Sequence, residues 1–392
     1  MFRSTRLAAV ASVFFMPTIS YLGIGALDEA TAKLRKLGFK KPLLVCDAGV
    51  EKAGILGTVM ESLEKKCQMK PVVFKDVHPN PTSHNVEVGL GMLNSNACDS
   101  VVSVGGGSPQ DCAKGIALVK ANGGTIFDYE GLDKAEKQQF PLVAINTTSG
   151  TASEMTRFAV ITDEKRHVKM AVVTEKITPL IAINDARLMV GQPPALTAAT
   201  GMDALTHAVE AYVSLAASPT TDACALQAMR LIKQHLANAV RDGSDLVARE
   251  GMCYAEYIAG MAFNSASLGY VHAMAHQLGG FYDLPHGVCN AILLPHVQKY
   301  NAAVCAHRLR DVAGQLGVVT TGMNDDEAAA AAINAIRRLS KEVNIPRGFK
   351  ELGMREEDIP ALADAALKDI CSFTNPRQGS KEDVMNIYRE SM

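Results

Sequence analysis

The sequence predicts an α/β N-terminal domain built on a parallel sheet, followed by an all-helical domain, with a cleft between the two. Three observations support this fold class. From about residue 14 to residue 185, short apolar runs alternate with amphipathic stretches, which is the pattern of successive βαβ units. Beyond Pro193 and Pro194 the strand signals disappear, and helical spacing continues toward the C-terminus. A length of 392 residues is also typical of two domains.

Each expected strand is a short run rich in Val, Ile and Leu, bounded by Gly, Pro, Asn or Asp. The first strand is expected at 14–21, and the others at 42–46, 72–74, 100–104, 142–145 and 180–183. Amphipathic stretches between them predict helices that include 27–37 and 86–93. In the second half, helical spacing predicts helices at 196–214, 222–240, 246–262, 326–343 and 359–371. The boundary therefore falls near Gln192, which gives an α/β domain at 14–192 and a helical domain at 193–392.

Composition excludes several classes of partner. Hydrophobic residues make up 48% of the chain and charged residues 20%, so a large core can form without disulfides. The net charge of −2 includes no basic block, so we expect neither nucleic acid nor a membrane as a partner. The nine cysteines are odd in number and scattered, which is typical of free thiols in a reducing compartment.

The first residues, 1–13, are expected to be an extension outside the two domains. Arg3 and Arg6 precede an apolar run at 7–16 that is too short to span a membrane. Since transit peptides are rich in Arg and Ser and poor in acids, a cleaved presequence is one interpretation of this segment. We expect a cytoplasmic location, with the mitochondrial matrix as the close alternative and secretion disfavoured by the free thiols.

The clearest chemistry of the first half lies in a glycine-rich turn. A buried strand leads into Gly105, Gly106 and Gly107, with Ser108 where a helix N-cap belongs and Pro109 at the first helical position. The three glycines let the backbone approach a ligand closely, and the free N–H groups of the following helix suit a pyrophosphate. The alternative is a tight turn with no ligand. The segment lacks the G-x-G-x-x-G fingerprint, so by itself it does not decide between them.

Two further polar segments follow predicted strands. Asp47 ends the strand at 42–46, where a carboxylate can accept a hydrogen bond from a ribose hydroxyl and repel a 2′-phosphate, which would favour NAD over NADP. A lone Asp at such a place is also a common turn or cap residue. The loop 146–151 (Asn-Thr-Thr-Ser-Gly-Thr) follows the strand at 142–145, and its hydroxyls could line the same edge of the sheet.

The second half contains a constellation of possible metal ligands. Asp203 and His207 are spaced i, i+4 on a predicted helix, and His272 and His276 repeat that spacing on another, which Gly279 and Gly280 are expected to end. His286 follows from a predicted Leu-Pro-His-Gly turn. One carboxylate and three neutral imidazoles suit Fe(II) or Zn(II). The alternative is that these histidines satisfy hydrogen bonds in the core; two i, i+4 pairs and a turn histidine favour the metal. The absence of Glu beside His272 argues against a zinc protease.

The two halves together resemble the iron-dependent (group III) alcohol dehydrogenases, a family with a dehydroquinate synthase-like architecture. The resemblance is carried by five runs: Gly105-Gly-Gly-Ser-Pro-Gln-Asp111, Asn146-Thr-Thr-Ser-Gly-Thr-Ala-Ser-Glu-Met-Thr156, Thr200-Gly-Met-Asp-Ala-Leu-Thr-His-Ala-Val-Glu210, Gly269-Tyr-Val-His-Ala-Met-Ala-His-Gln-Leu-Gly279 and Leu284-Pro-His-Gly-Val-Cys-Asn-Ala-Ile-Leu-Leu-Pro-His296. It covers the chain from about residue 14 to the end. It is closest to the branch of propanediol/lactaldehyde oxidoreductase, 1,3-propanediol dehydrogenase and methanol dehydrogenase.

The resemblance assigns a role to individual residues of this sequence. It implies that the metal ligands are Asp203, His207, His272 and His286. It implies that His276 is catalytic and faces the nicotinamide. The implied cofactor contacts are Asp47, Asn80, Gly105, Gly106, Gly107, Ser108, Thr147, Thr148, Thr151, Lys169 and His276. The implied walls of the substrate pocket are Phe158, Phe263 and Cys371, although Phe263 could equally pack a helix into the core.

The function implied is the interconversion of small primary alcohols and aldehydes by hydride transfer to or from NAD, with NADP less favoured. The metal, Fe(II) or alternatively Zn(II), would act as a Lewis acid on the substrate oxygen. A homodimer or higher homo-oligomer is expected. The alternative function is a metal- and NAD-dependent lyase of the dehydroquinate synthase type. That lyase would need a basic phosphate-binding cluster beside the metal, and none appears near 203–286. A non-catalytic binding module is the other alternative, which an assay of reduced nicotinamide with a short aldehyde would exclude.

Overall fold

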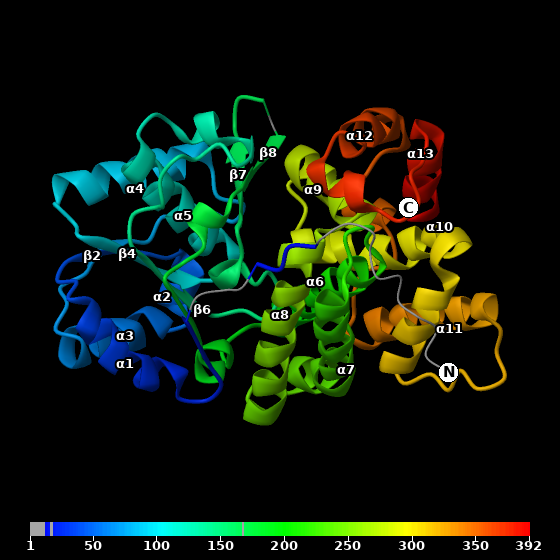
Figure 1. The fold of residues 1–392 in the computed structure, drawn as a ribbon, viewed down its shortest axis with the longest axis horizontal. Helices are drawn as coiled ribbons and strands as arrows, with labels where there is room; N and C mark the ends of the chain where they lie inside the picture. Colours follow the sequence, from blue (N-terminus) through cyan, green and yellow to red (C-terminus); the bar gives the residue numbers. More distant parts are fainter. Residues whose placement is uncertain (1–11, 16–18, 167) are drawn as a thin grey trace. The chain divides into compact units, whose positions relative to one another are not determined.

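The computed structural model describes residues 12–15, 19–166 and 168–392. These residues form two compact units (Figure 1). The first, here called the α/β unit, comprises the described residues from Ile19 to Gln192, together with Gly243–Tyr254. The second, here called the helical unit, comprises Pro193–Asp242 and Ala255–Met392, together with residues 12–15. The predicted fold class is confirmed.

A parallel sheet forms the centre of the α/β unit. Among the described residues it contains six strands in the order β1-β9-β6-β4-β2-β3, and every neighbouring pair is parallel. The strands are β1 (Ile19–Leu22), β2 (Pro42–Val45), β3 (Val72–Phe74), β4 (Ser100–Gly105), β6 (Leu142–Asn146) and β9 (Ile181–Asn184). Since helices cover both faces, the strands β2, β4, β6 and β9 are buried along their whole length rather than alternating between buried and exposed residues.

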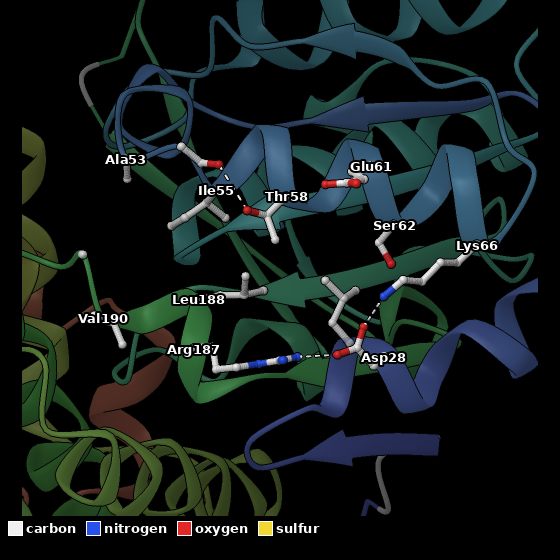
Figure 2. A pocket seen from close by; sticks show the side chains of 13 residues that line it. Asp28, Ala53, Ile55, Thr58, Glu61, Ser62, Lys66, Arg187, Leu188 and Val190 are labelled. Carbon is white, nitrogen blue, oxygen red and sulfur yellow. Dashed lines mark hydrogen bonds and ion pairs between the residues drawn. The ribbon is translucent and has the colours of Figure 1, made fainter.

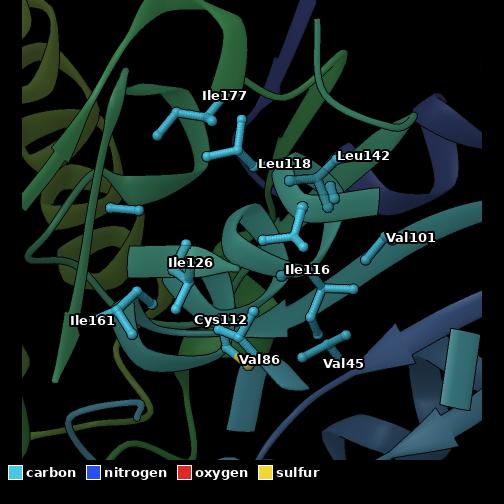
Figure 3. Close-up of a cluster of buried hydrophobic side chains, with 14 of the residues drawn as sticks. Val45, Val86, Val101, Cys112, Ile116, Leu118, Ile126, Leu142, Ile161 and Ile177 are labelled. Atoms are coloured by element: carbon cyan, nitrogen blue, oxygen red, sulfur yellow. The ribbon is translucent and has the colours of Figure 1, made fainter. Parts of the chain in front are cut away.

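Helices pack on the two faces of this sheet and give it two apolar cores. One core includes residues of α1 (Ala26–Leu37), α2 (Ala48–Lys52) and α3 (Ile55–Glu61); the other includes residues of α4 (Ser83–Ser95) and α5 (Gly107–Asn122). Figure 3 shows the second core, in which Val45 of β2 lies with Val86 of α4 and Ile116 of α5. Leu44, one residue earlier on the same strand, belongs to the first core, because successive side chains of a strand point to opposite faces.

Two strand predictions differ from the structure. The first strand begins at Ile19, so the expectation of a strand from residue 14 is wrong for Phe14 and Phe15, while residues 16–18 lie outside the described part. Its partner β9 is four residues long and pairs with it from Ile19↔Ile181 to Leu22↔Asn184, which limits β1 to the same length. Sequence analysis also missed a second sheet, of order β5-β8-β7, formed by β5 (Gly131–Leu132), β7 (Phe158–Asp163) and β8 (Val168–Val173).

The helical unit is built mainly from long helices. They are α6 (Pro194–Val213), α7 (Pro219–Arg241), the later part of α8 (Leu246–Ala266), α9 (Tyr270–Tyr282), α10 (His286–Gln315), α11 (Asp325–Glu342), α12 (Ile359–Ala366) and α13 (Lys381–Glu390). The first part of α8, up to Tyr254, belongs to the α/β unit. None of the helices in the described part of the chain is long and apolar enough to cross a membrane.

Two predicted helix ends are wrong. The helix carrying His272 does not stop at Gly279 and Gly280 but continues to Tyr282, where Asp283 ends it in the left-handed conformation (φ 54°). The helix expected at 359–371 ends at Ala366. Asp369 then begins a separate short turn, because its side chain accepts a hydrogen bond from the backbone N–H of Cys371 (2.9 Å).

Candidate metal centre and nucleotide site

The helical unit brings together the four residues expected to bind a metal. Helix α6 carries Asp203 and His207, α9 carries His272, and α10 begins at His286, which is therefore on a helix rather than in the predicted turn. The Oδ1 atom of Asp203 lies 3.9 Å from Nε2 of His207, 3.7 Å from Nε2 of His272 and 3.6 Å from Nε2 of His286. Ligands held at about 2.1 Å from a tetrahedral ion lie roughly 3.4 Å apart, so these separations fit one small divalent cation.

The charge state of Asp203 suits a cation. The residue is 2% exposed. Burial alone would raise the pKa of its carboxyl group, but the neighbouring imidazoles of His207, His286 and His272 outweigh burial and hold that pKa well below its ordinary value. Asp203 is therefore a carboxylate at neutral pH, enclosed by imidazoles.

The contacts of Asn290 are a second observation that fits a cation at this cluster. Its side-chain Nδ2 lies 2.6 Å from Oδ1 of Asp203, 3.1 Å from Nε2 of His272 and 3.0 Å from Nε2 of His286. An amide nitrogen has two hydrogens and cannot satisfy three acceptors at once. With Nε2 unprotonated on both rings, as metal ligation requires, the excess of lone pairs fits a bound cation. Sequence analysis missed Asn290, although its position four residues after His286 on one helix face was a usable signal.

His276 lies beside this cluster. Its ring is stacked against that of His286, with centroids 5.5 Å apart, and its Nδ1 is 2.8 Å from Oδ2 of Asp369. Burial alone would raise the pKa of Asp369. The neighbouring His276 and the hydrogen bond from the N–H of Cys371 lower it by more, so the pKa lies below its ordinary value. Burial raises the pKa of the Cys371 thiol well above its ordinary value. Asp369 was missed from sequence because its contact with His276 joins segments 93 residues apart.

The expected pocket residues belong to different units. Phe263 of α8 is in the helical unit, where its ring stacks on the imidazole of His207 with centroids 4.3 Å apart. Cys371 belongs to the same unit and lies near His276 and Asp369. Phe158 begins β7 in the α/β unit. Phe263 therefore contacts a residue of the candidate metal site. Phe158 belongs to the same unit as the candidate cofactor residues of the sheet.

In the α/β unit, the expected cofactor residues follow three adjacent strands. Asp47 comes soon after β2, the glycines 105–107 end β4 and begin α5, and the threonines of 147–151 follow β6. Because β2, β4 and β6 are parallel neighbours, their carboxyl ends share one edge of the sheet. Open α/β sheets bind ligands at that edge.

The two loops at this edge pack tightly on one another. A Cβ atom on Gly106 would lie 2.8 Å from Cγ2 of Thr148, and one on Gly107 would lie 2.9 Å from Cγ2 of Thr151. Only glycine therefore permits both loops to approach this closely. The expectation that Ser108 is the N-cap of α5 is wrong. Gly106 occupies that position, and the Ser108 hydroxyl instead accepts a hydrogen bond from the backbone N–H of Asn80 (3.2 Å).

The remaining cofactor candidates also have local partners. The side chain of Asn80 accepts a hydrogen bond from Nζ of Lys169 on β8 (2.8 Å), so Asn80, Ser108 and Lys169 are linked. Asp47 is the N-cap of α2, and its Oδ1 accepts a hydrogen bond from the N–H of Val50 (2.8 Å). The cap interpretation of Asp47 thus holds as a structural fact, while its contact with a ribose stays a prediction.

A cavity of about 700 Å³ lies elsewhere in the α/β unit, beside α1 and α3 (Figure 2). Asp28 lines it and forms ion pairs with two basic side chains, at 2.5 Å from Nζ of Lys66 and 2.8 Å from a guanidinium nitrogen of Arg187. None of the residues predicted to bind cofactor, metal or substrate lines it.

A glycine-rich loop at the carboxyl edge of a parallel sheet, and a cluster of one carboxylate and three imidazoles of which only that of His286 is partly exposed, are features of enzymes that combine a nucleotide with a metal ion. The chain belongs to the iron-containing alcohol dehydrogenase family. The family model "Iron-containing alcohol dehydrogenase" matches residues 17–186, and "Fe-containing alcohol dehydrogenase family, C-terminal" matches residues 197–392. The predicted family and enzyme class are confirmed.

Individual relatives support this membership along the whole chain. Alcohol dehydrogenase 4 of Schizosaccharomyces pombe is 51% identical over 387 residues, which cover 98% of this chain and 90% of that protein. NAD-dependent methanol dehydrogenase of Bacillus methanolicus is 45% identical over 97% of this chain and 99% of its own. A solved 1,3-propanediol oxidoreductase superposes with a TM-score of 0.95 at 46% identity, over 98% of this chain and all of that one. The lyase alternative finds no support in these relatives.

Proposed function

We propose that this enzyme oxidises small primary alcohols to aldehydes, and reduces those aldehydes, with NAD as the hydride carrier and a divalent metal in the helical unit. The observation that carries the proposal is that the Nε2 atoms of His207, His272 and His286 all lie within 3.9 Å of Oδ1 of Asp203. Fe(II) is the proposed metal and Zn(II) the alternative, since both accept this donor set.

The proposed roles of the metal ligands follow from their chemistry. When bound there, the metal supplies Lewis-acid polarisation of the alcohol or carbonyl oxygen. Asp203 contributes the only carboxylate of the four and so offsets part of the ion's charge. The three imidazoles must be neutral with Nε2 unprotonated to bind. Burial lowers the pKa of His272, but its contacts with Asp203 and Glu210 raise that pKa to about 9, so metal binding there displaces a proton.

The α/β unit is proposed to hold the cofactor. Free N–H groups at the start of α5 point to the edge where Gly106 and Gly107 meet Thr148 and Thr151, and they suit a pyrophosphate. The nicotinamide supplies the acceptor or donor of the hydride. Asp47 at the same edge supports NAD over NADP, because a carboxylate repels the 2′-phosphate. The name of one relative, the NAD-dependent methanol dehydrogenase of Bacillus methanolicus, agrees with this preference.

We infer that His276 moves the proton that the reaction releases or consumes. The carboxylate of Asp369 accepts the Nδ1–H of the ring, which leaves Nε2 as the atom that takes or gives the proton. A histidine next to the metal ligands but paired with its own carboxylate is well suited to this role.

The proposed substrates are unbranched primary alcohols of two to four carbons and the matching aldehydes. The names of relatives such as 1,3-propanediol dehydrogenase and methanol dehydrogenase support small substrates. Phe263, Cys371 and Phe158 are the proposed walls. A homodimer or higher homo-oligomer, and a cytoplasmic rather than mitochondrial location, also stay predictions.

The direct test follows the absorbance of NADH when a short aldehyde is added to protein loaded separately with iron or zinc. We expect NADH loss with at least one metal. Replacing His286 with Ala should nearly abolish turnover and lower the metal content, because one of four ligands is lost. His296→Ala, at a histidine outside the set, is the matched control. A His286→Ala protein with full metal content would show that His286 is not a ligand.

A further inference from the structure

One buried carboxylate next to the metal cluster has no part in the roles above. Glu210 lies on α6, three residues after His207 and seven after Asp203, so the three share one helix face. It is 1% exposed. An unpaired buried carboxylate is strongly destabilising, so the hydrogen-bond partners of Glu210 indicate its role.

The Glu210 carboxylate caps the start of α9. Its Oε1 accepts a hydrogen bond from the N–H of Val271 (2.7 Å), and its Oε2 lies 3.4 Å from the N–H of His272. The N-cap residue of α9, Gly269, has no side chain to satisfy these groups. A Cβ atom on Gly269 would lie 2.8 Å from Oε1, so glycine at this position leaves room for the carboxylate. Negative charge at a helix N-terminus is also favourable to the helix dipole.

The same carboxylate fixes the state of the His272 ring. Its Oε2 lies 2.6 Å from Nδ1 of His272. Since a carboxylate only accepts hydrogen bonds, neutral His272 must carry its proton on Nδ1. The lone pair of Nε2 is then directed at the cluster, where that atom lies 3.7 Å from Oδ1 of Asp203. A ligand histidine oriented by a carboxylate is a recurrent means of tuning metal sites.

We propose that Glu210 is a positioning residue of the metal centre: it selects the tautomer and rotation of His272 and anchors the helix end that carries both His272 and His276. This inference rests on the proposed metal site. Beyond the four proposed ligands, it assigns an effect on metal affinity to Glu210, a residue that is not itself a proposed ligand.

The test compares metal affinity in Glu210→Gln and Glu210→Ala with that of the unmodified protein, by competition with a chelator. We expect the dissociation constant for Fe(II) or Zn(II) to rise about 10–100-fold, with a changed visible spectrum of the cobalt(II)-substituted protein. Glu327→Gln is the matched control. Glu327 also caps a helix N-terminus, through its contact with the N–H of Asn324 (2.8 Å), but it belongs to α11, whose residues include none of the proposed ligands.

Melting temperatures of the metal-free proteins show whether each variant is folded, and the comparison with Glu327→Gln separates positioning from a general loss of stability. The proposal requires Glu210→Gln to lose metal affinity while Glu327→Gln retains it, whatever each does to the melting temperature. Affinity within about threefold of the unmodified protein in Glu210→Gln would overturn it. If Glu210→Ala does not fold, Glu210→Gln, which keeps the side-chain volume, decides alone. Failure of the unmodified protein to bind metal would instead refute the proposed function, and this inference with it.

Discussion

At the scale of the residue, Asp47 combines a structural role with a proposed one. Its Oδ1 accepts the N–H of Val50 and so caps α2, at the edge of the sheet where the glycine loop begins. The same carboxylate is proposed to face the ribose of NAD. The two roles are compatible, because a carboxylate has several acceptor sites.

Replacing Asp47 therefore separates the two roles. Asp47→Gly should raise kcat/KM with NADP relative to NAD by roughly tenfold, equivalent to about 1.4 kcal/mol, since the repulsion of the 2′-phosphate is removed. Asp47→Asn keeps the N-cap and removes the charge, so it should show a similar change with less loss of stability. Steady-state kinetics with both cofactors checks this. An unchanged ratio in both variants would mean that Asp47 acts only as a cap.

Phe263 is the second residue whose interpretation the structure changes. The substrate-wall role remains a prediction, but its ring stacks on His207 and is 4% exposed. Phe263→Ala should therefore destabilise the protein by about 3–5 kcal/mol and loosen His207, which weakens metal binding. Phe263→Leu, which keeps most of the volume, should do so less. Thermal unfolding and chelator competition measure both effects, and kcat/KM for ethanol, butanol and hexanol tests the wall. Equal losses for all three alcohols would remove Phe263 from the substrate site.

The residues of the candidate site were predictable from sequence to the extent that spacing or resemblance marks them. Asp203 and His207 share a helix face at i, i+4, and the glycine loop has a recognisable composition. Glu210 had a comparable signal, at i+7 from Asp203, but a single Glu on a helix is usually read as exposed. Asp369 had none, because its contact with His276 depends on how α9 and the turn after α12 pack.

At the scale of the element, helices and central strands followed from local patterns, and the exceptions have physical causes. The hairpin of β7 and β8 was missed because β7 ends in the polar residues Thr162 and Asp163, β8 carries Lys169, and both strands are only half buried. Helix α9 continues through two glycines because its face is buried, and tertiary packing outweighs their low helix propensity of about 1 kcal/mol each.

One buried lysine links helix α5 to the segments that follow β6, near the carboxyl edge of the sheet. Lys114 of α5 is fully buried, and its Nζ donates hydrogen bonds to Oγ of Ser153 (3.0 Å) and to the carbonyl of Phe158 (2.6 Å). Asp111, one turn earlier, accepts the N–H of Val160 (2.9 Å). The pair therefore attaches α5 to the loop after β6 and to β7.

The pKa of Lys114 gives this arrangement a pH dependence. Burial lowers that pKa from 10.5 to about 8, although Asp111 and Glu154 act to raise it. Between these two values the unfolded chain binds more protons than the folded one, so this group makes stability rise with pH, by at most about 1.4 kcal/mol per pH unit. The free energy of unfolding of the unmodified protein, measured by denaturant from pH 7.5 to about pH 10, should therefore rise relative to that of Lys114→Met. Parallel pH profiles for the two proteins would mean that Lys114 keeps an ordinary pKa.

At the scale of the whole molecule, the two units divide the proposed binding roles. The four proposed metal ligands belong to the helical unit, whereas all the proposed cofactor contacts except His276 belong to the α/β unit. Each ligand should then stabilise mainly the unit that holds it. At 100 times its dissociation constant, a ligand that binds only the folded state adds about 2.7 kcal/mol.

Removing the metal tests this division. Treatment with a chelator should abolish turnover. The dissociation constant for NADH, measured by fluorescence, should change by no more than about threefold, because all the proposed cofactor contacts except His276 belong to the unit that does not hold the metal. A threefold change corresponds to about 0.6 kcal/mol. Adding back iron or zinc should restore turnover and raise the melting temperature of the helical unit, and NADH should raise that of the α/β unit. Calcium, which prefers six or more oxygen ligands, is the control and should restore nothing. If NADH affinity instead falls more than tenfold without metal, the cofactor must depend on the metal or on His276 for its binding. The division of roles between the units would then be wrong.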